Sequence, residues 1–205
     1  MTARTAAENP KISGAGVSGL GLSIREFLRE PRLVGSGFPA SRYLVEKLLA
    51  PVDWSGVRLV VEFGPGTGPL TRALLAHMPR ASRLVAIDVS DPFTAYLRRT
   101  IHDPRLMAVT GSAEDAAGLL KARGVGQADL IVTGIPFSTM SNIQADRIMD
   151  GSLQVLRQDG MFLAYQMRSA IAPLLHARFE YVRKSYEWRN IPPCHLYWAQ
   201  REARA

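Results

Sequence analysis

The sequence predicts an α/β fold in which a mostly parallel sheet is covered by helices on both faces. From about residue 57 onward, apolar runs of strand length alternate with stretches that have the spacing of amphipathic helices. The apolar runs are continuous rather than alternating, which is typical of strands buried on both faces of a parallel sheet. Two β-rich runs close the chain and predict a terminal antiparallel hairpin.

Five parallel strands are predicted, and each is followed by a helix. The predicted strands are Val57–Phe63, Leu84–Asp88, Leu106–Thr110, Leu130–Thr133 and Met161–Gln166. The predicted helices lie near Pro69–His77, Pro92–Ile101, Ala113–Ala122, Asn142–Leu156 and Ser169–Ala177. The closing hairpin is expected in "FEYVRKSYEWRNI" and "HLYWAQRE", which are joined through Pro192 and Pro193.

The segment before the first predicted strand differs in composition from the rest. Residues 1–21 are rich in Ala, Gly, Ser and Thr and are predicted to form a flexible tail. Residues 22–55 are predicted to form two short helices, the second beginning at Pro39 and ending before Pro51. We therefore expect a tail, a helical segment that contacts membrane or substrate, and a catalytic domain over residues 56–205.

The composition points to a basic globular protein in a reducing compartment. The formal net charge is +7 and the pI is about 10.0, which favours partners that carry phosphate, either nucleic acid or an anionic membrane surface. Cys194 is the single cysteine, and the four histidines lack ligand spacing, so we expect neither a disulfide framework nor a metal site. The sequence has no apolar run of about 20 residues and no secretory signal, which predicts a cytoplasmic location.

A glycine-rich turn follows the first predicted strand, in "VVEFGPGTGPLTRAL". Its spacing is Glu-x-Gly-x-Gly-x-Gly and not the Gly-x-Gly-x-x-Gly of pyrophosphate binding, so a ligand without phosphate is predicted. The turn resembles motif I of S-adenosylmethionine-dependent methyltransferases. By that resemblance, the cofactor site contains Glu62, Gly64, Pro65, Gly66 and Gly68.

The ends of the next two strands supply further candidates for the cofactor site. Asp88 lies roughly 20 residues beyond the turn, where a carboxylate can meet ribose hydroxyls; the alternative is a solvated acid or helix cap. After the third strand, such enzymes usually have an acidic residue for the adenine amine, but this chain has Ser112, followed by Ala113 and Glu114. Either the Ser112 hydroxyl or the Glu114 carboxylate fills this role, or Glu114 is only a first-turn acid that favours the helix dipole.

The segment "TGIPF" follows the fourth strand and is close to the Asn-Ile/Leu-Pro-Tyr/Phe signature of enzymes that methylate adenine amines. Thr133 and Gly134 are assigned to the cofactor side of this segment, and Ile135, Pro136 and Phe137 to the substrate side. Gly134 has no side chain that could orient an adenine amine. We therefore predict a different amine, for which the glycine leaves space and backbone carbonyls.

Four segments together resemble the bacterial phospholipid N-methyltransferases: "REFLREPRLVGSGFPASRYL", "VEFGPGTGPLTRALL", "TGIPFS" and "WRNIPP". That family is similar in fold to the rRNA adenine dimethyltransferases. The resemblance implies a class I (Rossmann-like) methyltransferase fold with a seven-stranded sheet in the order 3-2-1-4-5-7-6. It also implies that S-adenosylmethionine is the methyl donor and that phosphatidylethanolamine is methylated stepwise towards phosphatidylcholine.

Several residues are candidates for handling the amine and the lipid phosphate. An ammonium group must lose a proton before it attacks, and aromatic or carbonyl groups must hold the growing cation. The candidates for this catalytic role are Tyr165, Tyr43, Ser138 and His195; the alternative for Tyr165 and His195 is a structural role. Arginine matches phosphate bidentately, so the candidates for the lipid phosphate are Arg42, Arg168 and Arg189.

Basic and apolar residues are interleaved in the first predicted helix. Arg25, Phe27, Leu28, Arg29 and Arg32 suit a helix that lies on an anionic membrane, and the alternative is a helix packed on the domain with a solvated basic face. We therefore expect a peripheral enzyme at the inner face of the cell membrane whose partners are the anionic surface and the phospholipid, and not nucleic acid. The competing hypotheses are an rRNA adenine or small-molecule amine methyltransferase, and a binding module that has lost catalysis.

Overall fold

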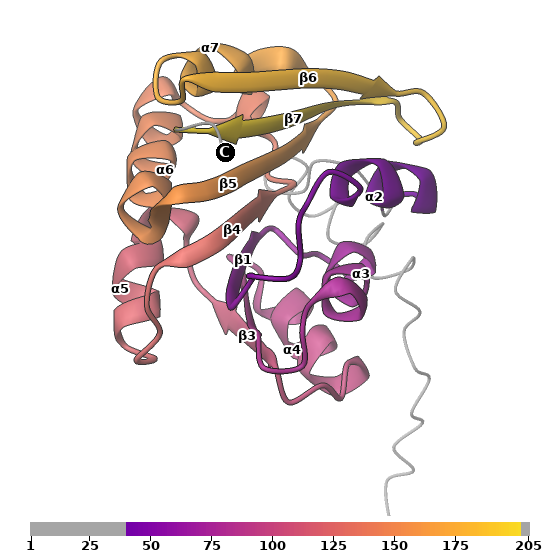
Figure 1. Cartoon of the computed structure of the whole chain (residues 1–205), viewed down its shortest axis with the longest axis vertical. Helices are drawn as coiled ribbons and strands as arrows, with labels where there is room; N and C mark the ends of the chain where they lie inside the picture. The colour runs from indigo at the N-terminus through magenta and orange to yellow at the C-terminus, as the bar shows by residue number, and fades with distance from the viewer. Residues whose placement is uncertain (1–39, 202–205) are drawn as a thin grey trace, which may run out of the picture.

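The computed structural model describes residues 40–201, and these form one seven-stranded sheet with helices on both faces (Figure 1). The sheet order is β3-β2-β1-β4-β5-β7-β6, as the resemblance implied. The strands are β1 (Leu59–Phe63), β2 (Arg83–Asp88), β3 (Leu106–Thr110), β4 (Ala128–Thr133), β5 (Leu156–Gln166), β6 (Tyr181–Glu187) and β7 (Cys194–Gln200).

The helices fall where the sequence predicts them. They are α2 (Arg42–Leu49), α3 (Pro69–His77), α4 (Asp91–Thr100), α5 (Ala116–Lys121), α6 (Asn142–Val155) and α7 (Ala172–His176). Short 3-10 turns, η1 (Ala113–Asp115), η2 (Phe137–Thr139) and η3 (Ser169–Ile171), precede α5, α6 and α7. The predicted tail and the first predicted helix, with Arg25, Phe27, Leu28, Arg29 and Arg32, lie outside the described residues.

Strand direction creates a crevice at one edge of the sheet. Strands β1 to β5 pair in parallel, and β7 pairs antiparallel with both β5 and β6, which confirms the terminal hairpin. From β1 the chain first builds outward to β2 and β3 and then returns to place β4 on the other side of β1. Open α/β sheets bind ligands at the carboxyl ends of the strands where the order reverses in this way.

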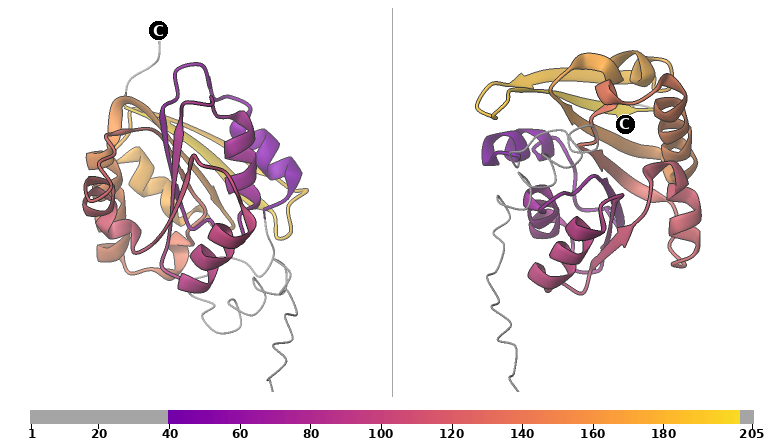
Figure 2. Two further views of the ribbon diagram at one scale, coloured as in Figure 1. Left: turned by 90° about the horizontal axis from the view of Figure 1, so that it is seen from below. Right: turned by 180° about the vertical axis from the view of Figure 1, so that it is seen from behind.

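The side chains of alternate residues in the central strands pack into two separate cores. Val61 of β1 and Ile131 of β4 pack with α5, α6 and α7, whereas Val60 and Leu130 pack with α2 and α3. Figure 2 shows these two helical layers from below and from behind, with α4 beside α3. Every residue of β1 and β4 is buried, as their continuous apolar runs predict.

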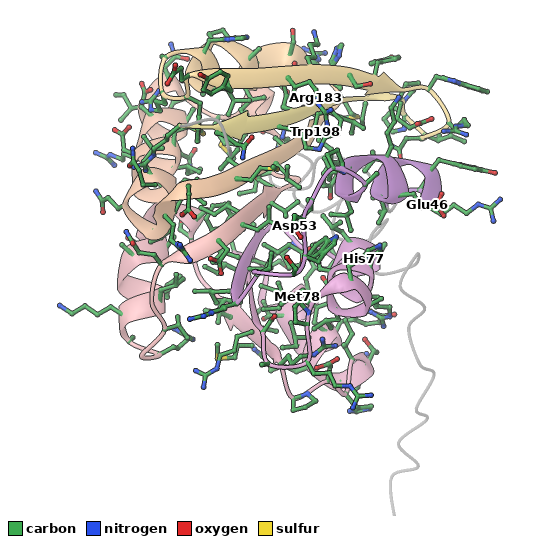
Figure 3. The ribbon with its side chains drawn as sticks, viewed as in Figure 1. Glu46, Asp53, His77, Met78, Arg183 and Trp198 are labelled. Atoms are coloured by element: carbon green, nitrogen blue, oxygen red, sulfur yellow. The ribbon has the colours of Figure 1, made fainter. Side chains whose placement is uncertain are left out.

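Helix α2 is fixed on the sheet by Trp198 of β7. The Trp198 indole N–H donates to the Leu48 carbonyl at 2.8 Å, and the Arg183 guanidinium of β6 lies 4.4 Å from the centre of the Trp198 ring (Figure 3). The helix begins at Arg42, and not at the predicted proline three residues earlier, with Ser41 as its N-cap. This attachment holds the last turn of α2 against the sheet.

Two strand boundaries differ from the predicted ones for identifiable reasons. Strand β1 begins at Leu59, because the Asp129 carboxylate accepts hydrogen bonds from the Arg58 and Leu59 amides at 2.7 and 2.9 Å. Strand β5 begins at Leu156, five residues before the predicted start, and its pairing with β4 is interrupted by a register shift. Both features lie at the amino edge of the sheet, away from the crevice.

Among the described helices, none is long and apolar enough to cross a bilayer.

Candidate active site

A cavity opens at the carboxyl edge of the sheet, where β1 and β4 lie side by side. Its walls are the turn after β1, the end of β2, the start of α4, the loops after β3 and β4, the end of β5 and the β6–β7 loop. One wall therefore comes from contiguous sequence around the glycine turn. The opposite wall is assembled from segments that are distant in sequence.

The glycine turn shapes the first wall through its backbone. Gly64, Gly66 and Gly68 all have positive φ, at 70°, 55° and 83°, a conformation that favours glycine. A Cβ on Gly66 would meet no protein atom within 4 Å, so this residue faces the open cavity, and Pro65 lines the cavity beside it. A Cβ on Gly68 would lie 2.5 Å from the Leu97 side chain, so Gly68 serves the packing of α4 and does not line the cavity.

Two carboxylates lie beside the turn. Asp88 lines the cavity, and its two oxygens accept hydrogen bonds from the Gly66 amide at 3.2 Å and the Ser90 amide at 2.9 Å. Glu62 is buried behind the turn, where the Thr71 hydroxyl donates to its Oε2 at 2.7 Å. Its Oε1 has no hydrogen-bond partner among the described residues. This orphaned oxygen suits a ligand that brings a donor or a positive charge.

Burial raises the pKa of the Glu62 carboxyl from its ordinary value of 4.5 to about 8. The Thr71 hydrogen bond opposes this shift, and the nearby charge of Asp88 adds to it. A buried carboxyl of this kind holds a proton until a cation arrives. At neutral pH the Glu62 carboxyl is therefore largely protonated in the protein without a ligand.

The adjacent wall is largely apolar. Ile87, Val89 and Phe93 line it, and Phe93 is nearly fully buried. Sequence reasoning missed Phe93, because an apolar residue on an amphipathic helix is usually part of the core. This apolar wall lies beside the polar groups of the glycine turn and Asp88.

The structure places the two alternatives after β3 differently. Ser112 and Ala113 line the cavity, and the Ser112 hydroxyl also accepts a hydrogen bond from the Glu114 amide at 3.2 Å. The Glu114 carboxylate accepts a hydrogen bond from Gln144 at 3.0 Å and lies 3.9 Å from Arg147. Gln144 lines the cavity, whereas Glu114 lies behind it.

The loop after β4 brings Gly134 against Tyr165 of β5. A Cβ on Gly134 would lie 2.2 Å from the Tyr165 hydroxyl oxygen and 2.4 Å from Cζ. The tyrosine hydroxyl thus occupies the place where any other side chain at position 134 would begin. The expectation that Gly134 leaves open space for the substrate is wrong for this reason: the space is filled by Tyr165, which itself lines the cavity.

Tyr165 stays protonated in this setting. Burial raises the pKa of its hydroxyl well above the ordinary value of 10.0, and the neighbouring Glu62 carboxylate raises it further. A neutral phenol can accept or donate a hydrogen bond, and its ring face attracts a cation. It does not remove a proton from an ammonium group.

Gln166 holds the rest of the "TGIPF" loop in place. Its side-chain amide donates to the Ile135 carbonyl at 2.7 Å, and its oxygen accepts from the Phe137 amide at 3.3 Å. Ile135 lines the cavity, as do the neighbouring Pro136 and Ser138. Phe137 instead packs in the core, and Thr133 is buried with its hydroxyl accepting from the Ile135 amide.

Tyr43 and two of the three candidate arginines form a cluster beside the cavity. The Tyr43 ring lies between Arg42 and Arg189, whose guanidinium carbons are 4.7 and 4.4 Å from its centre. Arg189 also forms an ion pair with the buried Glu187 at 2.8 Å. None of these side chains lines the cavity.

His195 and Arg168 also lie outside the cavity. The His195 ring contacts the Tyr186 ring in a tilted arrangement, with 4.9 Å between ring centres, and burial lowers the pKa of His195. His195 faces away from the site because the preceding residue, Cys194, lines the cavity and side chains alternate along a strand. Arg168 is exposed, next to Met167, which does line the cavity.

The β6–β7 loop closes the far wall through Asn190. Its side-chain oxygen accepts from the Ser41 amide at 2.8 Å, across 149 residues of sequence, and its amide donates to the Pro192 carbonyl at 2.7 Å. The sequence motif "NIPP" marked this segment but gave it no role.

In the described residues, no group of three or more His, Cys, Asp and Glu side chains could hold a metal ion.

Comparisons with known proteins find similarity to methyltransferases. A family model described as "Methyltransferase domain" matches residues 60–160. The chain is 26% identical to an ornithine lipid N-methyltransferase from Singulisphaera acidiphila over 87% of this chain and 94% of that protein. It is 32% identical to ribosomal RNA small subunit methyltransferase A from Sulfurihydrogenibium sp., but over only 31% of this chain and 24% of that protein.

The fold is also found among solved structures. The N-methyltransferase NodS from Bradyrhizobium japonicum WM9, in complex with S-adenosyl-l-homocysteine, superposes with a TM-score of 0.59. The superposition covers 86% of this chain and 88% of NodS, at 18% sequence identity. The cavity described above therefore lies in a fold that carries methyl transfer elsewhere.

Proposed function

We propose that this chain, a class I S-adenosylmethionine-dependent methyltransferase, methylates the amine nitrogen of a membrane-lipid headgroup. The headgroup that we propose is phosphatidylethanolamine, methylated stepwise towards phosphatidylcholine. One observation carries the choice of amine: the Tyr165 hydroxyl stands where the side chain of residue 134 would begin. The similarity to a lipid N-methyltransferase over 94% of its length supports the choice of a lipid.

The residues of the first wall fit the methyl donor. The Gly64–Gly66 turn allows a ligand to approach the backbone, Asp88 presents a fixed carboxylate, and the orphaned oxygen of Glu62 suits a cationic ligand. When bound, S-adenosylmethionine supplies an electrophilic methyl group, which a neutral amine nitrogen accepts as the carbon–sulfur bond breaks. The proton that the amine loses passes to solvent, because Tyr165 is already protonated.

The second wall favours an aliphatic amine over an adenine. An amide side chain at position 134 would overlap Tyr165, so no such group reads the edge of a base. A buried base donor without a partner costs about 1–3 kcal/mol. An aliphatic amine needs only one acceptor and a surface that tolerates the methylated cation, and the Tyr165 hydroxyl and ring provide both.

Ornithine lipid is a second candidate headgroup. The similarity to an ornithine lipid N-methyltransferase at 26% identity supports this candidate. Like phosphatidylethanolamine, ornithine lipid presents a primary amine on a flexible chain. The two headgroups differ in their anion, which is a phosphate diester in phosphatidylethanolamine and a carboxylate in ornithine lipid. Direct competition between the two lipids distinguishes them.

The test offers labelled S-adenosylmethionine with four acceptors in separate reactions. These are phosphatidylethanolamine vesicles, ornithine-lipid vesicles, unmodified ribosomal RNA and free ethanolamine. We expect label in the phosphatidylethanolamine extract, at a rate that rises with pH as the amine loses its proton. The matched variant Tyr165→Phe keeps the ring and should lower the lipid rate without changing donor affinity. Label confined to RNA or to free ethanolamine would overturn the proposal.

A further inference from the structure

The exposed apolar side chains of this protein are concentrated on one edge. Among the described residues, the exposed large hydrophobic side chains are Val89, Ile143, Met167, Tyr181, Tyr186, Trp188 and Ile191. All except Tyr181 lie at or beyond the carboxyl end of the sheet. Tyr181 begins β6 at the opposite end. Singly scattered apolar residues need no explanation, but a one-sided distribution does.

The topology of the sheet brings these residues together. Val89 directly follows β2, Met167 directly follows β5, and Ile143 is in the first turn of α6. Trp188 and Ile191 lie in the β6–β7 loop, which returns to this edge because β7 runs antiparallel to β5 and begins opposite its last residue. Figure 1 shows this loop projecting beside α2.

These residues surround the mouth of the cavity. Val89 and Met167 are part of the cavity wall, and Ile191 lies between Asn190 and Pro192, which also line it. Trp188 and Ile191 are the most exposed of the set, each at 72%. The most exposed apolar side chains of the described chain are thus in the same loop that closes the cavity.

Basic side chains accompany the apolar ones. Arg42 and Arg168 are exposed at the same edge, and Arg189 and Lys47 share the single buried carboxylate of Glu187. The exposed acids at this edge include Glu46 on α2, Asp91 at the start of α4 and Asp115 in η1, and Asp91 lies 3.5 Å from Arg98. Around the β6–β7 loop and α2, where Trp188 and Ile191 lie, the four basic side chains of Arg42, Lys47, Arg168 and Arg189 outnumber the two acidic ones of Glu46 and Glu187, so this part of the edge is positive.

We propose that this rim, defined as Val89, Ile143, Met167, Trp188 and Ile191 with Arg42, Arg168 and Arg189, docks on an anionic lipid bilayer. Trp188 and Ile191 enter the boundary between headgroups and acyl chains, and the arginines meet lipid phosphates. The cavity then opens directly onto the headgroup layer, so a lipid amine reaches Tyr165 without leaving the bilayer. The inference rests on the proposed function for its substrate, but the docking itself is independent of catalysis.

Charge and shape favour a bilayer over other occupants. A second copy of this chain would bring a second positive edge against the first, which is repulsive. A bilayer accepts a ring of separated apolar side chains, because each one inserts individually between headgroups. It also takes the amphipathic ring of Trp188, since tryptophan is enriched at membrane interfaces.

Vesicle binding of the full chain tests the surface. The double variant Trp188→Ser/Ile191→Ser should partition into phosphatidylglycerol vesicles at least about tenfold more weakly than the wild type. The control is Tyr181→Ser, an exposed aromatic at the opposite end of β6 with 46% exposure, which should bind like the wild type. High salt should weaken wild-type binding, because it screens the arginines. Equal binding by the double variant would overturn the inference, including the case in which residues 1–39 carry the docking.

A second measurement does not depend on a substitution at the rim folding well. The wild-type tryptophan emission should shift to shorter wavelength and become sensitive to quenchers placed at the interface when vesicles are added. Trp188→Phe should lose this shift, since Trp54 and Trp198 lie elsewhere. The absence of a shift in the wild type would refute the assignment. So would dimerisation or RNA binding that depends on Trp188, if it replaced vesicle binding.

Rates of methyl transfer to lipid in vesicles and to monomeric lipid distinguish a failure of the docking surface from a failure of the proposed function. With phosphatidylethanolamine in vesicles, the double variant should lose activity in proportion to its lost binding. With a short-chain phosphatidylethanolamine dispersed as monomers, it should match the wild type. If the wild type methylates neither form but still binds vesicles through the rim, the proposed function fails while the docking surface stands.

Discussion

The two walls of the cavity are built in different ways. The donor wall is a backbone structure: Gly64 and Gly66, both with positive φ, line the cavity together with Asp88, while Gly68 and the buried Glu62 support the turn from behind. The amine wall is a side-chain structure, in which Tyr165 lies over Gly134 and Asn190 joins the β6–β7 loop to the start of α2. Contiguous sequence specifies the first wall, whereas the second depends on how distant segments meet.

The walls also differ in charge. Asp88 is the one carboxylate among the described residues that line the cavity, and it belongs to the donor wall. The amine wall presents neutral groups, including Tyr165, Gln166 and Asn190. A neutral wall does not favour the protonated amine, so the reactive form is not suppressed. It also has no opposite charge that would retain the methylated cation. The difference suits a site that holds a cationic donor firmly and releases its product.

The largest effect is expected where the amine wall is tightest. In Gly134→Ala, the new Cβ would lie 2.2 Å from the Tyr165 hydroxyl, so the tyrosine must leave its place. A displacement of about 1 Å in a reacting group can cost about 100-fold in rate, and we expect a loss of turnover of at least this order. Donor affinity, measured by calorimetry with S-adenosylhomocysteine, should change little. The control is Gly118→Ala on α5, where a Cβ meets nothing within 4 Å. Full turnover in Gly134→Ala would show that the position of Tyr165 does not matter.

A substitution in the donor wall should have a smaller effect, and it should lower donor affinity while leaving turnover at saturating donor nearly unchanged. Asp88→Ala removes a carboxylate that fixes the turn and faces the cavity. Donor affinity should fall by about 1.5–3 kcal/mol, the range for charge-assisted hydrogen bonds. The rate at saturating donor should remain closer to that of the wild type. Asp91→Ala, an exposed carboxylate three residues along the chain, is the matched control. Unchanged affinity in a folded Asp88→Ala protein would remove Asp88 from the donor site.

The last expected effect is a pH dependence of the stability of the protein without donor, which leaves turnover out of the measurement. The pKa of Glu62 is about 8 in the folded protein and 4.5 ordinarily, so the folded state binds the proton more tightly. This contribution to stability is complete below about pH 4.5 and is lost as the pH rises towards about 8. The free energy of unfolding should fall across this window by at most about 1.4 kcal/mol per pH unit. Urea unfolding at a series of pH values measures it. Glu62→Gln should flatten the slope, and an identical slope in the variant would assign the effect to another group.

Much of the fold was predictable, because local pattern and tertiary structure agree. The continuous apolar runs became buried parallel strands, and the last two β-rich runs became the hairpin of β6 and β7. The strand boundaries at Leu59 and Leu156 were not predictable, because one depends on the Asp129 side chain and the other on a register shift with β4. Interactions across many residues of sequence leave no local pattern.

The sequence by itself determined the donor wall, because a glycine turn between a buried strand and a helix carries its geometry in its own backbone. It also determined that position 134 has no side chain. Only the tertiary structure decided what fills that place: Tyr165 reaches it because β4 and β5 pair in register, with Thr133 opposite Ala164. The same holds for the rim, where Trp188, Ile191 and Met167 lie at the same edge of the sheet because β7 returns antiparallel to β5. The sequence states which side chain stands at each position. The surface that this side chain forms with others depends on the strands that bring them together.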